Sequence, residues 1–176
     1  NPTSPYGVCK AFCVQMGKVY RFGYGMHVSN GILYNHESPR RGENFVTQKI
    51  VRGAASIAQG KTEFLELGNL DIERDWGYAP DYVQGMWMML QQKQSDDYIL
   101  ATGKTHKLSD FLQLSFEYFG IDHQKHIRIN PKFVRPNEPV QLCGDSSKAQ
   151  NILGWKTTIC FEKMVLEMCR AAEKNN

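Results

Sequence analysis

The sequence predicts an α/β fold, in which helices and short strands alternate along the chain and pack in layers. Segments with the apolar spacing of helices are separated by short apolar runs that suit strands. This alternation favours layered helices and strands over a helix bundle or a β-sandwich. The chain has 176 residues, of which 41% are hydrophobic, so it is long enough to form about one domain with a real core.

The first elements are defined by residues that begin helices and by an apolar stretch. Ser4 and Pro5 suit an N-cap and the first helical position, so a helix is expected over about 5–22. A buried strand is expected near 27–34, where an apolar stretch ends in a polar loop. The remaining expected elements are a helix at 45–59 ended by Gly60, strands near 63–67 and 73–76, a helix at 79–92, a strand at 98–102, a helix at 108–119 ended by Gly120, and helices at 146–153 and 161–172.

Two of these helices carry apolar side chains that we assign to the core. In the 79–92 helix, the stripe of Trp87, Met88 and Met89 fits core packing better than a cofactor site. The last helix has an apolar face that predicts a buried side. Its members are Phe161, Met164, Val165 and Met168.

Composition favours a cytoplasmic enzyme part that binds neither nucleic acid nor membranes. The net charge is only +3, and the basic residues are spread among acidic ones rather than collected in a stripe. No apolar run approaches the roughly 20 residues that span a bilayer, and the first residues lack a signal-peptide pattern. Five cysteines without paired C-x-x-C clusters fit reduced thiols. We expect Cys9, Cys13 and Cys169 to pack rather than to bind zinc.

The first helix contains a pair of side chains with catalytic potential. Tyr6 and Lys10 are four residues apart, so they share a helix face. The Lys10 ammonium can then stabilise the phenolate of Tyr6 and make it a usable base near neutral pH. Taken alone, this spacing fits a surface helix pair better than a catalytic pair, because short motifs often match by accident.

Longer segments make the pair more specific. They are HVSNGILYNHESPRRGENFVTQKI, LGNLDIERDWGYAPDYVQGMWMMLQ, DDYILATG and FVRPNEPVQLCGDSSKAQNILGWK. Together with Tyr-x-x-x-Lys, and in this order, they closely resemble GDP-mannose 4,6-dehydratases of the extended short-chain dehydrogenase/reductase superfamily. The resemblance covers nearly the whole chain.

The resemblance implies a partial fold. A dinucleotide-binding domain of this superfamily opens with a glycine-rich turn between a strand and a helix, and the chain has no such turn. We therefore expect the last part of a Rossmann-type parallel sheet plus the smaller α/β substrate-binding domain. Residues 1–44 are assigned to the NADP-binding Rossmann domain with the Tyr-x-x-x-Lys helix, and residues 45–176 mainly to the nucleotide-sugar domain. The implied partners are the missing N-terminal Rossmann half and, when complete, further copies in a dimer or tetramer.

The resemblance also implies a reaction. GDP-mannose is oxidised at C4, with hydride passing to bound NADP and the hydroxyl proton to the Tyr6 phenolate. Water is then eliminated across C5 and C6, and hydride returns to C6, giving GDP-4-keto-6-deoxymannose. Lys10 matches the lysine that also binds the nicotinamide ribose. The family's Thr and Glu, which help C4 oxidation and C5 proton removal, correspond to positions before residue 1, so we expect the isolated chain to be inactive. Glu37 is interpreted as structural.

Further residues match positions that bind cofactor or substrate in the family. Asn35 matches a contact to the nucleotide sugar, and His36 and Arg41 match contacts to NADP. Lys49 and Arg74 resemble diphosphate partners, since Lys acts as a point charge and Arg can bond phosphate bidentately.

In the RPNE segment, Arg135 and Glu138 resemble the pair that holds the nucleoside end. Without the resemblance, Arg74 and Asp75 would fit a surface ion pair equally well. The resemblance implies that the connection from Gly120 to Arg135 is shorter than in many relatives. No metal site is expected.

Two alternatives stay open from the residues alone. A related GDP-hexose reductase or epimerase would keep Tyr6 and Lys10 but differ in the upstream carboxylate. A catalytically silent nucleotide-sugar-binding fragment or regulatory subunit would suit a chain that lacks the glycine-rich turn.

Overall fold

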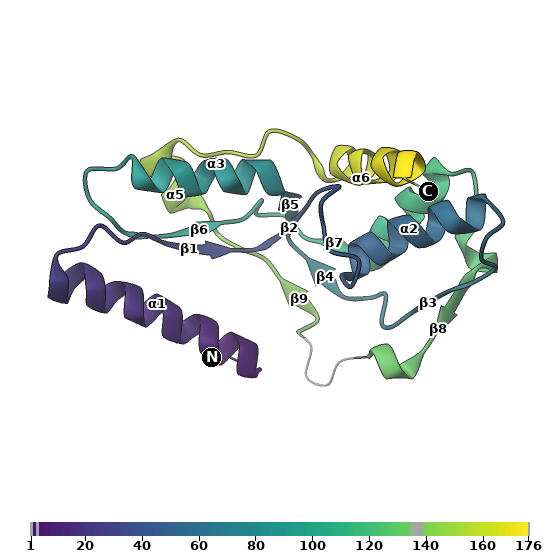
Figure 1. Cartoon of the computed structure of the whole chain (residues 1–176), viewed down its shortest axis with the longest axis horizontal. Helices are drawn as coiled ribbons and strands as arrows, with labels where there is room; N and C mark the ends of the chain where they lie inside the picture. Colours follow the sequence, from purple (N-terminus) through teal and green to yellow (C-terminus); the bar gives the residue numbers. More distant parts are fainter. Residues whose placement is uncertain (1, 3, 135–138, 176) are drawn as a thin grey trace.

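A computed structural model describes residues 2, 4–134 and 139–175, and its helices and strands alternate as the sequence predicts (Figure 1). The helices are α1 (Pro5–Tyr24), α2 (Val46–Ala58), α3 (Ala79–Leu90), α4 (Leu108–Tyr118), α5 (Ser147–Leu153) and α6 (Phe161–Asn175). The strands are β1 (Asn30–Leu33), β2 (Asn35–Glu37), β3 (Leu65–Leu67), β4 (Glu73–Arg74), β5 (Trp76–Tyr78), β6 (Asp97–Leu100), β7 (His106–Lys107), β8 (Ile127–Ile129) and β9 (Gln141–Leu142). The predicted α/β class is confirmed.

Helix α1 begins and ends as local chemistry dictates. Ser4 is its N-cap, and the Ser4 hydroxyl oxygen accepts a hydrogen bond from the Gly7 backbone N–H at 3.1 Å. The helix ends at Gly25, whose φ of 63° lies in the left-handed region that glycine adopts without a Cβ penalty. The predicted helix is confirmed, and it runs two residues beyond position 22.

The strands pair mainly in parallel. Strand β1 pairs with β6, β2 with β5, and β3 with β8, while β4 lies between antiparallel β7 and parallel β9. Helix α1 lies on one face of the β1–β6 pair, and α3 and α5 lie on the other (Figure 1). This arrangement of a parallel pair between helices is a three-layer α/β unit.

The prediction of one buried strand near 27–34 is wrong in two respects. The segment forms two short strands, β1 and β2, separated at Tyr34. Strand β1 is half-exposed, and its Ile32 has 40% of its surface open to solvent. The physical reason is that, within the described residues, β1 has a paired neighbour on one edge only, which is β6.

Buried side chains form two clusters. The larger lies among α2, α4, α6 and β3 and includes the fully buried Phe111 and Phe116. The face of α6 that the sequence assigns to the core is buried there, as predicted. The smaller cluster joins α3, β6 and α5 and includes Tyr82 and Trp155. The chain therefore passes between the two clusters more than once, and residues well beyond position 44 pack with the β1–β6 pair.

Some side chains assigned to packing are instead exposed. Met89 is buried and Met88 half-buried, but Trp87 is 61% exposed, because α3 turns it away from the strands. Cys169 is buried as expected, whereas Cys9 and Cys13 lie on the exposed surface of α1. The packing prediction is therefore wrong for Trp87, Cys9 and Cys13.

Polar contacts attach α1 to the strands. Asp97 on β6 accepts hydrogen bonds from Arg21 at 2.5 Å and from Asn30 at 2.7 Å. The Asn30 amide also donates to the Val14 carbonyl at 3.2 Å. A Cβ on Gly17 would meet the Asn30 side chain, so glycine at this position lets the helix approach β1 closely.

The charge of Asp97 should make stability depend on pH. Burial raises the pKa of Asp97, but hydrogen bonds and charges from Arg21, Asn30 and Lys18 outweigh it, so the pKa lies below its usual value of 3.8. Because the folded-state pKa is depressed, the stabilisation is present above pH 3.8 and is lost as pH falls through the lower folded value. The free energy of unfolding of wild type minus that of Asp97→Asn, measured by urea titration, should therefore shrink below about pH 4. A difference that stays constant from about pH 7 to pH 2 would contradict this assignment.

Candidate functional site

The Tyr6–Lys10 pair has the helical geometry that the sequence predicts. Lys10 Nζ lies 5.5 Å from the centroid of the Tyr6 ring, and both side chains are exposed, Tyr6 by 72%. A phenol with an ammonium on the same helix face is a pair of side chains that can exchange a proton with a bound hydroxyl. The hydrogen bonds that attach α1 to the strands begin at Val14, so the first turns present this pair beyond the anchored part of the helix.

Strand β2 carries Asn35, His36 and Glu37 beside β5. Asn35 is in register with Trp76, and Glu37 with Tyr78. The Glu37 carboxylate is buried and accepts a hydrogen bond from the Thr47 hydroxyl at 2.7 Å. Burial raises the pKa of Glu37, while Thr47 and Arg41 act against this increase. These contacts join β2 to α2 and agree with the structural role expected for Glu37.

Besides Lys10, two residues are expected to contact the cofactor, and both are held by neighbouring groups. His36 stacks on Tyr82, with ring centroids 5.0 Å apart, and its Nδ1 lies 2.8 Å from the Tyr34 carbonyl oxygen. Arg41 Nε lies 3.2 Å from Glu37 Oε2, and its guanidinium lies 3.5 Å from the centroid of the Phe45 ring. Both side chains are therefore positioned before any ligand binds.

Lys49 lies in a cavity of about 320 Å³ between α2, β3 and the segment before residue 134. Its Nζ donates a hydrogen bond to the Glu66 carbonyl at 2.7 Å and lies 3.9 Å from the centroid of the Phe133 ring. The cavity combines two ammonium groups, two amides, an aromatic ring and an apolar wall. Its lining consists of Asn44, Val46, Lys49, Leu67, Gly68, Asn69, Ile72, Leu108, Lys132 and Phe133.

Four polar or aromatic lining residues were not predicted from the sequence: Asn44, Asn69, Lys132 and Phe133. Two signals were available. Asn44 directly precedes the predicted 45–59 helix, and the INPKFV segment directly precedes RPNE. Neither signal shows that these residues line one cavity. The segment around Asn69 meets the segment around Phe133 through the parallel pairing of β3 with β8, which are distant in the sequence.

Arg74 on β4 is buried, with 7% of its surface exposed. Its Nη1 donates hydrogen bonds to the Glu73 carbonyl at 2.7 Å and to the Pro139 carbonyl at 2.9 Å. Asp75 is fully buried. Its carboxylate accepts hydrogen bonds from the Thr102 hydroxyl and from backbone N–H groups of Thr102, Gly103 and Gly144. The alternative of a surface ion pair is wrong because both side chains are buried.

The structure brings only some of the predicted site residues together. Lys49 lines the cavity with Ile72, which stands two residues before Arg74. Tyr6 and Lys10 lie on α1, outside this cavity lining, as does Asn35 on β2.

Arg135 and Glu138 lie outside the described residues. In the described part of the chain, no group of three or more His, Cys, Asp or Glu side chains could hold a metal ion. None of the described helices combines the length and apolar character that crossing a membrane requires.

Comparison with known proteins identifies close relatives. Residues 1–168 match the family model described as GDP-mannose 4,6 dehydratase. The chain is 48% identical over 168 residues to GDP-mannose 4,6 dehydratase 1 of Arabidopsis thaliana, covering 96% of this chain and 46% of the relative. It is 44% identical over 187 residues to the Drosophila melanogaster GDP-mannose 4,6 dehydratase, covering 97% and 47%. The chain thus spans about half the length of the curated relatives it matches.

Solved structures share the fold. RMD from Pseudomonas aeruginosa, complexed with NADPH, superposes with a TM-score of 0.85 at 21% identity, covering 100% of this chain and 57% of that one. At this identity the similarity shows the fold alone. It confirms the expected architecture, a partial Rossmann-type sheet joined to a substrate-binding α/β domain.

Proposed function

Because the chain belongs to the GDP-mannose 4,6-dehydratase family, we propose that it forms the substrate-binding part of a lyase that dehydrates GDP-mannose. The observation that carries the proposal is the family match over residues 1–168, which includes the exposed Tyr6–Lys10 pair in its i, i+4 geometry. The chain spans about half of its relatives' length, so turnover requires a preceding half that supplies the rest of the site.

In this proposal Tyr6 and Lys10 handle the proton at C4 of the hexose. The Tyr6 phenolate accepts the C4 hydroxyl proton as the carbonyl forms. The adjacent Lys10 ammonium lowers the free energy of the phenolate, because opposite charges a few ångströms apart attract. Elimination of water across C5 and C6 then needs a carboxylate that the preceding half supplies.

The cofactor in the proposal is NADP, which supplies reversible hydride acceptance when bound. The residues present fit such a group. The Tyr6 and Lys10 side chains are exposed on the first turns of α1, so they are accessible to a bound cofactor. We assign Lys10 to the nicotinamide ribose, and His36 and Arg41 to further cofactor contacts. A fold neighbour solved with NADPH supports a nicotinamide cofactor.

The cavity around Lys49 is the proposed site for the nucleotide end of the substrate. Lys49 and Lys132 offer positive charge to a diphosphate, and the Phe133 ring offers a stacking surface to a base. Asn35 is assigned to the sugar and Arg74 to the diphosphate. Arg135 and Glu138 are assigned to the nucleoside, as the resemblance implies.

We also propose the expected organisation around this site. The Rossmann part covers residues 1–44 and the substrate domain mainly residues 45–176. The complete protein is cytoplasmic, which its free cysteines support. It forms a dimer or tetramer, which the exposed Val8, Phe12 and Phe22 on α1 support.

Calorimetric titration of the chain with GDP-mannose tests the substrate assignment. We expect GDP-mannose to bind more tightly than UDP-glucose. In Lys49→Met the affinity should fall about tenfold or more, because a hydrogen bond to a charged group is worth about 1.5–3 kcal/mol. Lys49 is a sharper probe than Arg74, because Arg74 is buried and its guanidinium bonds two backbone carbonyls, whereas Lys49 is half-buried.

The matched control is Lys163→Met, an exposed lysine on α6 outside this cavity. Its affinity for GDP-mannose should equal that of wild type. Equal affinities for GDP-mannose and UDP-glucose, or unchanged binding by Lys49→Met, would refute the assignment of the cavity to a GDP-sugar.

A further inference from the structure

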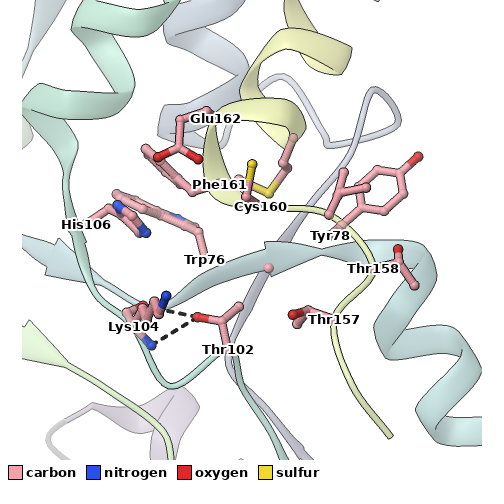
Figure 2. Close-up of a pocket in the computed structure, with 13 residues that line it drawn as sticks. Trp76, Tyr78, Thr102, Lys104, His106, Thr157, Thr158, Cys160, Phe161 and Glu162 are labelled. Carbon is pink, nitrogen blue, oxygen red and sulfur yellow. Dashed lines mark hydrogen bonds between the residues drawn. The ribbon is translucent and has the colours of Figure 1, made fainter.

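A second cavity, of about 330 Å³, lies where β5, the segment around Thr102 and the start of α6 meet (Figure 2). None of its lining residues belongs to the Lys49 cavity. Helix α6 lies on the opposite side of the strands from α1, which carries Tyr6 and Lys10 (Figure 1). The cavity is therefore distinct from the Lys49 cavity and from the Tyr6–Lys10 pair, while its β5 residues pair with β2.

The inner wall of the cavity is aromatic. Trp76 and Phe161 are stacked, with ring centroids 6.0 Å apart and an interplanar angle of 22°. The His106 ring is nearly parallel to Phe161, with centroids 3.9 Å apart and an angle of 6°. Met164 adds a flexible apolar side chain to this wall. Such a surface favours a planar or apolar group over a fully hydrated ion.

Two basic side chains at the mouth are not paired. In the described part of the chain, neither Lys104 Nζ nor the ring nitrogens of His106 make a hydrogen bond or an ion pair. Only the backbone groups of Lys104 are bonded, to the Thr102 hydroxyl (Figure 2). The Thr157 hydroxyl faces the same space from the other wall. These groups can donate hydrogen bonds to an anion that enters.

The one carboxylate in the lining already has partners. The Cys160 thiol donates a hydrogen bond to Glu162, and this bond together with the Glu162 backbone N–H lowers the pKa of the carboxyl group. Glu162 also lies in the first turn of α6, where the helix dipole compensates a negative charge. The Lys104 ammonium and the His106 ring therefore lie near a carboxylate whose charge is already compensated.

From these contacts we propose that this cavity binds a small organic anion, in which a carboxylate or phosphate group is attached to a planar ring. The anionic group contacts Lys104, His106 and Thr157. The ring lies against the wall formed by His106, Phe161 and Trp76. The proposal does not depend on the dehydratase activity, because it uses a different cavity and different side chains.

Three cysteines in different surroundings allow a site-specific test, with phenyl phosphate as the probe. Cys160 lines the cavity, Cys143 is exposed elsewhere, and Cys169 is buried in the core. Iodoacetamide labelling of each thiol is followed by peptide mass spectrometry. A ligand of this size binds with a Kd of about 1 mM, so about 10 mM probe should slow Cys160 labelling roughly tenfold. Cys143 labelling should not change, and unlabelled Cys169 reports an intact fold.

Variants and simpler probes separate the contributions of the Lys104 charge, the anionic group and the ring to the protection of Cys160. Lys104→Gln should abolish most of the protection, whereas Lys163→Gln, an exposed lysine on α6 outside the cavity, should retain it. Inorganic phosphate has the anionic group without the ring, and benzyl alcohol has the ring without the anionic group. Each should protect Cys160 from labelling less than phenyl phosphate does. Absence of protection by phenyl phosphate, equal protection by benzyl alcohol, or full protection in Lys104→Gln would overturn the proposal.

Discussion

Replacing Tyr6 by Phe is expected to lower turnover of GDP-mannose by about 10²–10⁴-fold, because the variant loses the group that accepts the C4 proton. The experiment needs a complete site. A chimaera can provide it, with this chain placed after the N-terminal half of the Arabidopsis thaliana relative to which it is 48% identical. Turnover is measured with saturating NADP by following formation of the 4-keto product.

Tyr24→Phe is the matched control, because it removes a hydroxyl from an exposed tyrosine at the other end of α1. It should keep wild-type turnover. Lys10→Met should also reduce turnover, because negative charge that develops on the Tyr6 oxygen loses a nearby positive charge. Wild-type turnover in Tyr6→Phe would remove Tyr6 from the mechanism without affecting the substrate assignment.

Asp75→Ala should lower the free energy of unfolding by about 3–5 kcal/mol, because three backbone N–H groups and the Thr102 hydroxyl lose a buried, charged acceptor. Those groups belong to Thr102, Gly103 and Gly144. The carboxylate thus holds the end of β6 and the segment before α5 against the β4–β5 connection. Urea unfolding followed by circular dichroism measures the change.

Asp71→Ala is the corresponding control. Asp71 is exposed and lies four residues earlier in the same segment, so its replacement should change the free energy of unfolding by no more than about 0.5 kcal/mol. A loss below about 1 kcal/mol in Asp75→Ala would mean that water replaces the carboxylate as acceptor.

The helices show how much of the fold could be predicted locally. Helix α1 begins where Ser4 caps it, and α2 ends just before Gly60, as expected from the residues themselves. The apolar face of α6 follows from helical spacing. These features depend on residues within a few positions of one another, so they can be predicted from the sequence without knowing the fold.

The Tyr6–Lys10 pair could be found in the same way, because i, i+4 spacing fixes its geometry. Lys49 and Arg74 were identified by resemblance, but their surroundings were not. The sequence could not show that Lys49 meets Phe133, or that Arg74 is buried and bonded to Pro139. The exposure of Trp87 was missed because a stripe of apolar residues does not reveal which of them faces a neighbour.

The sequence by itself determined the α/β class, the positions of the helices, the family and the i, i+4 spacing of the candidate catalytic pair. Only the tertiary structure decided that β1 is half-exposed, that Asp75 is buried among backbone donors, and that Lys104, His106 and Cys160 line one cavity. The physical reason is the range of the interactions. Caps and helical faces arise from neighbouring residues, whereas strand pairing, burial and cavities depend on segments that are distant in the chain and meet only after folding.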